Sequence, residues 1–97
     1  MIHGPHEQRC VRALVQGRVQ GVGFRWFVRN AARERALAGW VRNRFDGSVE
    51  LEIQGRARDL ESLFDALRRG PGSARVDRID TEDLPLDRNR SGFEIKF

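Results

Sequence analysis

The sequence is poor in cysteine, with Cys10 alone in a chain of 97 residues. A single cysteine cannot form an internal disulfide, and no cluster of cysteine and histidine has the spacing of a structural zinc site. These absences argue against a disulfide scaffold and against a zinc module. Cysteine usage of this kind predicts a protein of the reducing cytoplasm.

A targeting segment is also lacking. Residues 1–8 are short and polar and carry Gly4 and Pro5, so they predict a flexible tail and neither a signal peptide nor a membrane span. His3 and His6 lie in this tail without supporting carboxylates, a pattern that does not favour a metal site. We expect a single domain over residues 1–97, with residues 1–8 flexible, no metal, no cofactor and no membrane partner.

Lysine is scarce as well, since all but one of the 18 lysine and arginine residues are arginines and the formal net charge is +4. Such a charge is compatible with nucleic acid, a membrane surface or small anions as partners. The arginines alternate with acidic residues, as in residues 56–59 and 75–78, and form no long basic run. The distribution therefore favours a small anionic ligand, and we expect no nucleic-acid partner.

The chain is organised around residues 17–25, where three glycines separate a strand pattern from a helical pattern. Because glycine has no Cβ, Gly17, Gly21 and Gly23 allow successive backbone N–H groups to turn toward one point, a nest that binds oxyanions. Apolar residues at helical spacing follow, so the last amides are also the unpaired donors of a helix N-terminus, beside the forked guanidinium of Arg25. The predicted phosphate-binding residues are Gln20, Gly21, Val22, Gly23, Phe24 and Arg25.

Residues 17–25 resemble the signature G-x-V-Q-G-V-x-F-R of the acylphosphatases, small enzymes that hydrolyse the carboxyl-phosphate bond of acyl phosphates. Residues 39–49, followed by Gly55, resemble the family's other pattern: an aromatic after Gly, then Val-x-Asn, a Gly four residues on, and a Gly closing the next strand. The resemblance covers nearly the whole chain. It implies a metal-independent acylphosphatase in which Arg25 and Asn43 are catalytic, the amide of Asn43 orienting the attacking water.

Other catalytic chemistry finds little support in the sequence. Cys10 lies in a strand pattern with no histidine nearby, and no serine stands in a triad or a nucleophile elbow, so a covalent phospho-enzyme is not expected. An acyl phosphate has a good leaving group, and the protein needs only to hold the phosphoryl group and place a water in line. From spacing alone, Asn43 could also be a polar residue flanking the Asp46-Gly47 turn.

The pattern of the remaining chain predicts an α+β fold. The expected elements are an inner strand over 9–16, a helix from about 24 to 36 with its exit at Gly39, a hairpin of strands 40–44 and 48–54, a helix over 57–67 ended by Gly70-Pro71-Gly72, a more exposed strand around 76–79, and a last strand over 93–97. The order β-α-β-β-α-β, with a fifth strand appended, predicts a ferredoxin-like split-βαβ sandwich, an antiparallel sheet with two helices on one face.

Two alternatives to a free-standing acylphosphatase remain open at this point. The sandwich is also the architecture of RRM modules, and residues 21–27 faintly resemble their aromatic octamer, although this stretch enters a helix and not a strand. The second alternative is an acylphosphatase-like module that acts on carbamoyl phosphate within a larger maturation enzyme. A chain of 97 residues ending on a strand-forming Phe97 favours the free-standing enzyme.

The surface pattern and the motifs also give expectations about ligands. A charged surface without an evident apolar patch predicts a monomer. The motifs bind the phosphoryl end and leave the acyl end unspecified, so we expect an acyl phosphate as substrate and inorganic phosphate or sulfate as a competitive ligand. The exposure and the role of Trp26 are left open by the sequence.

Overall fold

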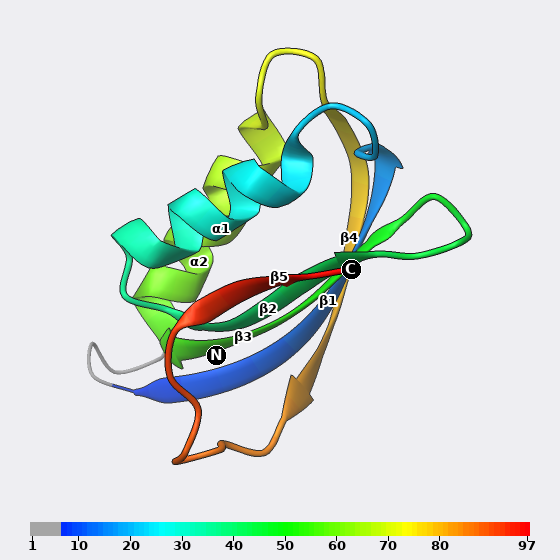
Figure 1. The fold of residues 1–97 in the computed structure, drawn as a ribbon. Coiled ribbons are helices and arrows are strands. Elements are labelled where there is room, and N and C mark those ends of the chain that lie inside the picture. Colours follow the sequence, from blue (N-terminus) through cyan, green and yellow to red (C-terminus); the bar gives the residue numbers. More distant parts are fainter. Residues whose placement is uncertain (1–6) are drawn as a thin grey trace.

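Two helices and a mixed five-stranded sheet make up the computed structural model, which describes residues 7–97 (Figure 1). The elements are β1 (Gln8–Arg18), α1 (Phe24–Glu34), β2 (Ala38–Asn43), β3 (Val49–Arg56), α2 (Ala57–Arg69), β4 (Arg75–Leu84) and β5 (Phe93–Lys96). Both helices cover the same face of the sheet, and the other face is open (Figure 1). No helix within residues 7–97 is long and apolar enough to cross a membrane.

The N-terminal prediction is only partly covered by this structure. Residues 1–6, with His3 and His6, lie outside the described residues. Gln8, which was assigned to the flexible tail, already belongs to β1 and pairs with Arg56 of β3. The predicted tail therefore reaches one residue too far, because β1 already begins at Gln8, before the apolar positions that define the strand pattern.

The strands lie in the order β4-β1-β3-β2-β5. β1 pairs antiparallel with both β3 and β4, so the prediction that it is an inner strand is confirmed. β5 pairs with β2 in parallel, however, and the expectation of an antiparallel sheet is wrong for this last pair. The reason lies in residues 85–92, which carry the chain from one sheet edge to the other along the end at which β2 also begins, so the two strands run in the same direction.

The core fills the space between the sheet and the helices. Alternate residues of the two central strands, among them Val11 and Leu51, face the helices and are buried. Each helix turns one apolar stripe toward them; the buried helix residues are Phe24, Val28, Ala31 and Ala32 from α1 and Ala57, Leu60, Leu63, Ala66 and Leu67 from α2. Burial of this apolar surface is the main driving force for the fold.

The turn between α1 and β2 differs from the prediction. The helix ends at Glu34 and not at residue 36, and Ala36 takes the left-handed conformation with φ 54°. Gly39 belongs to β2, where its φ is 148° and a Cβ would lie 1.9 Å from the backbone oxygen of Glu52. Gly39 is therefore needed for the close approach of β2 to β3, and it is not the exit from the helix.

Candidate active site

The loop between β1 and α1 has the backbone that the glycine pattern predicts at two of its three glycines. Gly21 and Gly23 have φ values of 73° and 76°, in the region that side chains with a Cβ rarely adopt. Gly23 is also the N-cap of α1, and the first turn of this helix contains no acidic residue. The first backbone N–H groups of α1 have no acceptor within the helix, so the positive end of its dipole faces the loop.

Gly17 is the exception among the three glycines. It lies in β1, opposite Val76 of β4, at the point where the pairing register shifts. Its φ is 137°, and a Cβ would lie 2.1 Å from the backbone oxygen of Arg75. Gly17 therefore permits close strand packing at an irregularity of the sheet, and the assignment of this residue to the anion nest is wrong.

A hollow of about 230 Å³ lies between this loop, the first turn of α1 and the end of β2. It is lined by Val19, Gly21, Gly23, Phe24, Arg25, Trp26 and Asn43. Four of the six predicted phosphate-binding residues line it, together with Asn43 from a distant part of the sequence. Trp26, whose role the sequence leaves open, is half exposed at its rim, with the guanidinium of Arg29 stacked 4.3 Å from the ring centroid.

The other two predicted phosphate-binding residues, Gln20 and Val22, do not line the hollow. The side-chain amide of Gln20 donates hydrogen bonds to the backbone oxygens of Arg44 and Ser48, at 2.7 and 2.9 Å. Val22 is half-buried and packs against the hydrophobic core. These two side chains therefore anchor the loop to the hairpin and to the core.

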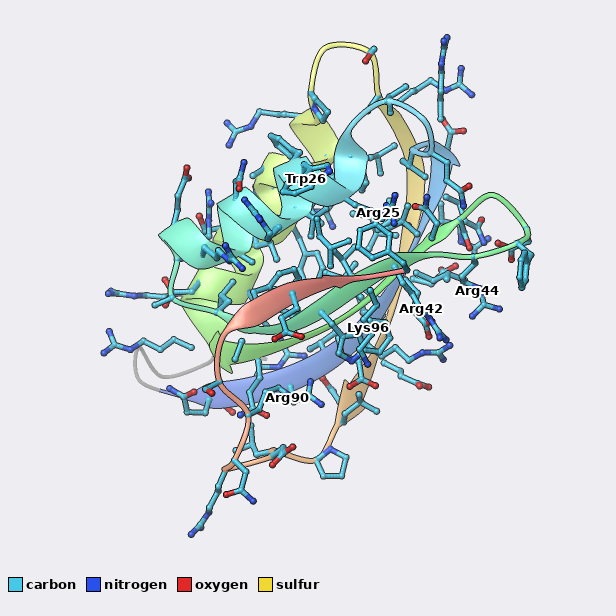
Figure 2. All side chains as sticks on the ribbon, in the orientation of Figure 1. Arg25, Trp26, Arg42, Arg44, Arg90 and Lys96 are labelled. Carbon is cyan, nitrogen blue, oxygen red and sulfur yellow. The ribbon has the colours of Figure 1, made fainter. Side chains whose placement is uncertain are left out.

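Arg25 stands at the start of α1 and is directed toward the end of β5 (Figure 2). Its guanidinium carbon lies 4.9 Å from the ring centroid of Phe97. No carboxylate within residues 7–97 forms an ion pair with Arg25, so its donors are available to an anion in the hollow. The contact with Phe97 could not be anticipated from the sequence, because it joins the beginning of the first helix to the last residue of the chain.

Asn43 is the last residue of β2 and pairs with Val49 of β3. Its neighbours Arg42 and Arg44 both contact Glu50, which places them on the open face of the sheet, while Asn43 lines the hollow on the helix side. The Oδ1 atom of Asn43 is buried and has no hydrogen-bond partner within residues 7–97. A buried acceptor of this kind is costly unless a partner satisfies it.

Other groups that could carry chemistry are separate from this hollow. Cys10 is buried, and burial raises the pKa of its thiol, an effect that the charge of Arg90 only partly offsets. A raised pKa keeps the thiol protonated and unreactive at neutral pH. Within residues 7–97, no three histidine, cysteine, aspartate or glutamate side chains are grouped to hold a metal ion.

Comparison with known proteins gives a consistent result. A family model described as Acylphosphatase matches residues 11–95. An acylphosphatase of Koribacter versatilis is 51% identical over 85 residues, which are 88% of this chain and 77% of the relative. The crystal structure of acylphosphatase from Bacillus subtilis superposes with a TM-score of 0.87 at 38% identity, covering 94% of this chain and all of that one. Full-length HypF in the phosphate- and nucleotide-bound form has a TM-score of 0.82 at 25% identity, but this chain covers only 12% of it.

Proposed function

This chain belongs to the acylphosphatase family and is a hydrolase of acyl phosphates, and we propose that the hollow beside Asn43 is where the hydrolysis takes place. The observation that carries the proposal is the meeting of Arg25 and Asn43, which come from different elements, in one hollow next to the glycine loop. The comparisons give no support to the RNA-binding alternative. Residues 21–27, which resemble an RRM octamer, run from the glycine loop into α1 and not along a strand, and Phe24 is buried in the core.

The first task of the site is to hold the phosphoryl group. The backbone N–H groups of the loop and of the first turn of α1 would donate to its oxygens, as helix N-termini do for phosphate groups. Arg25 would add a forked, charged pair of hydrogen bonds, for which no acidic side chain competes within the described residues. The same contacts would bind inorganic phosphate or sulfate as competitive ligands.

The second task is to place the nucleophile. The side-chain amide of Asn43, which lines the hollow, would hydrogen-bond a water there and orient its oxygen toward phosphorus. A bond forms between the water oxygen and phosphorus, the bond from phosphorus to the acyl oxygen breaks, and the carboxylate departs with the electron pair while the water's proton passes to the phosphate. Because a carboxylate is a good leaving group, this reaction requires no general acid.

The two roles are separable by kinetics. In Arg25→Ala, the phosphate inhibition constant should rise and turnover should fall by roughly 10²- to 10³-fold, the loss typical of one preorganised oxyanion donor. Lysine should rescue this variant poorly, because a point charge cannot form the fork. In Asn43→Ala, turnover should fall steeply while the phosphate inhibition constant stays nearly unchanged, because the loop and Arg25 remain.

The matched control is Asn30→Ala, which removes an asparagine from the exposed part of α1 and should leave both constants unchanged. Each variant is compared as a folded protein, with its turnover number and its phosphate inhibition constant measured on benzoyl phosphate. Near-normal turnover in Asn43→Ala, or a loss of phosphate binding as severe as in Arg25→Ala, would refute the role assigned to Asn43.

We further infer the finer features of the fold and its setting. The order β4-β1-β3-β2, with both helices on one face, supports a ferredoxin-like split-βαβ sandwich to which β5 adds a parallel edge. The family match over residues 11–95 supports a single acylphosphatase-like domain. We expect a monomeric cytoplasmic enzyme without a cofactor or a nucleic-acid partner, and sedimentation at micromolar concentration would test its oligomeric state.

A further inference from the structure

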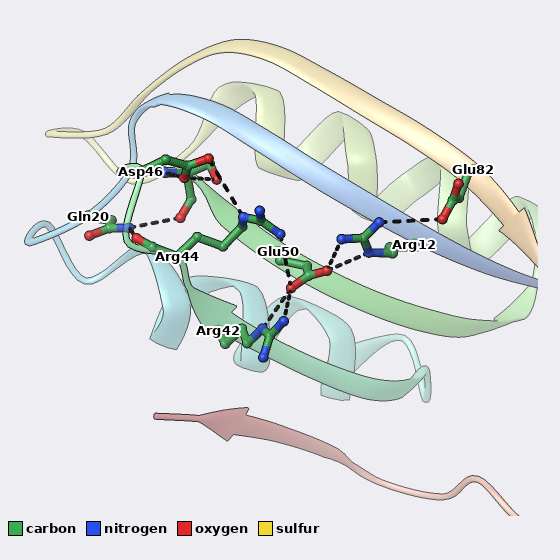
Figure 3. Close-up of polar contacts among 8 residues, drawn as sticks. Arg12, Gln20, Arg42, Arg44, Asp46, Glu50 and Glu82 are labelled. Atoms are coloured by element: carbon green, nitrogen blue, oxygen red, sulfur yellow. Dashed lines mark hydrogen bonds and ion pairs between the residues drawn. The ribbon is translucent and has the colours of Figure 1, made fainter.

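Glu50 of β3 is a buried carboxylate on the open face of the sheet, with 2% of its surface exposed. The alternation of β3 places this side chain opposite the core residues Val49 and Leu51, on the open face, yet it is buried. Three arginines surround the carboxylate, Arg12 from β1 and Arg42 and Arg44 from the end of β2 and the hairpin that follows it (Figure 3). Their guanidinium groups take the place of solvent around Glu50.

Both oxygens of this carboxylate are occupied. Arg42 donates to Oε1 through Nε at 2.7 Å, and Nη1 of Arg44 lies 3.7 Å from the same oxygen. Arg12 donates to Oε2, and it also reaches Glu82 of β4 at 3.5 Å. A buried charge is tolerated when its lone pairs are satisfied in this way. With Glu82 included, these ion pairs connect four neighbouring strands, β4, β1, β3 and β2, near the end of the sheet where the hollow lies.

The two arginines from this end of the sheet are the chain neighbours of Asn43. Since side chains alternate along a strand, contacts that hold Arg42 and Arg44 on the open face direct Asn43 to the helix face, toward the hollow. Within the described residues, Oδ1 of Asn43 has no partner that could hold it directly. The direction of this side chain therefore depends on the backbone that carries it.

That backbone is held from the other face as well. Gln20 of the glycine loop donates to the backbone oxygens of Arg44 and Ser48, on either side of the hairpin turn. Beyond these contacts the hairpin is exposed, with Phe45 projecting fully into solvent and Gly47 at a φ of 93°. The cluster of Glu50 with its three arginines on one face, and the Gln20 amide on the other, together hold residues 42–44, where β2 ends and the exposed turn begins.

We propose that Glu50 is a positioning residue for acyl phosphate hydrolysis, holding Arg42 and Arg44 so that the carboxamide of Asn43 faces the phosphoryl group. Glu50 does not line the hollow and would touch neither substrate nor water. Glu50 acts only by holding the backbone of residues 42–44 at the end of β2. The inference rests on the proposed role of Asn43 and names what sets the direction of that side chain.

The first test is Glu50→Gln, which keeps the size of the side chain and removes its charge. Turnover should fall roughly tenfold, less than the 10²-fold that a misplacement of about 1 Å can cost. The phosphate inhibition constant should stay unchanged, because Arg25 and the loop are untouched. The matched control is Glu52→Gln, on the same face of the same strand, whose ion pair with Arg90 at 2.8 Å lies away from the hairpin and whose loss should leave turnover unchanged.

A double variant separates positioning from general stabilisation. If Glu50 acts through Asn43, Glu50→Gln should cost no further turnover in the Asn43→Ala background, because the group that it aims is already absent. A further tenfold loss in that background would overturn the inference, as would wild-type turnover in Glu50→Gln with only its melting temperature lowered. Wild-type turnover in Asn43→Ala alone would instead refute the proposed function.

Arg42→Gln tests the same link if Glu50→Gln does not fold. Arg42 is half exposed, and it makes the shortest contact from the Asn43 side of the cluster. Its loss should also lower turnover without changing the phosphate inhibition constant, and this effect should likewise vanish in the Asn43→Ala background. Wild-type turnover in Arg42→Gln would overturn the inference.

Discussion

Sulfate binding offers a test of the phosphate site that does not depend on turnover. A ligand that binds only the folded protein stabilises it by mass action, and at about 100 times its Kd it adds about 2.7 kcal/mol to the free energy of unfolding. For a domain of 97 residues, this corresponds to a rise in melting temperature of roughly 10 to 20 °C. The site described above predicts such a rise for wild-type protein in sulfate or phosphate.

The share of this effect that depends on Arg25 follows from its surroundings. Its guanidinium has no acidic partner within residues 7–97 and lies over the ring of Phe97, so it loses no ion pair when it binds an anion. Hydrogen bonds to charged groups contribute about 1.5 to 3 kcal/mol, which corresponds to a roughly 10- to 100-fold weaker Kd in Arg25→Ala. The same sulfate concentration should then add only roughly 0.4 to 1.4 kcal/mol.

The assay is a thermal melt of each variant over a sulfate series. Sulfate also stabilises proteins generally, because it is excluded from their surfaces, so the informative quantity is the difference between variants. Arg29→Ala is the matched control: it removes an arginine from the next turn of α1, where the side chain stacks on Trp26, and it should keep the wild-type shift. Equal shifts in Arg25→Ala and wild type would refute the assignment of Arg25 to the phosphate site.

Three further predictions concern the reaction, the sheet and the response to acid. Benzoyl phosphate should be hydrolysed equally fast with and without a chelator, and a phosphate monoester should turn over far more slowly because an alkoxide is a poor leaving group. Gly39→Ala should lower the free energy of unfolding in urea by roughly 1 to 3 kcal/mol, since its Cβ would meet the backbone oxygen of Glu52, whereas Gly72→Ala, with open space around it, should not. Burial acts to raise the pKa of Glu50, but hydrogen bonds and charges from Arg42 and Arg12 outweigh it and lower this pKa below its ordinary 4.5. The unfolded chain therefore binds more protons in acid, so stability should fall as the pH drops below about 5, and urea titrations should show a smaller fall in Glu50→Gln.

Local sequence was sufficient to predict the order of the elements and most of the residues that line the hollow. The spacing of apolar residues predicted both helices and the central hairpin, because each of these patterns depends on only about ten consecutive residues. The two motifs placed Arg25 and Asn43 in one site, and both line the same hollow. Their catalytic roles remain predictions.

The features that were missed depend on contacts between distant segments. Gly17 and Gly39 read as loop and helix-exit residues, yet each stands where a Cβ would collide with a neighbouring strand. The parallel pairing of β5 depends on which edge of the sheet the chain reaches after residue 92. The burial of Glu50 requires Arg12 of β1, Arg42 of β2 and Arg44 of the hairpin turn, and no spacing along β3 indicates them.

The placement of charge explains why the residue proposed to aim the water is an amide. A phosphoryl group brings negative charge into the hollow, and two like unit charges about 4 Å apart repel by about 4 kcal/mol at an effective dielectric of 20. A carboxylate at position 43 would therefore oppose substrate binding, whereas the neutral Asn43 would hydrogen-bond a water without this repulsion. The buried carboxylate of Glu50 lies on the opposite face of the sheet, where arginines bind both of its oxygens. In this proposal, the sheet separates the negative charge of Glu50, which would hold the strand end, from the uncharged amide of Asn43, which would face the phosphoryl group.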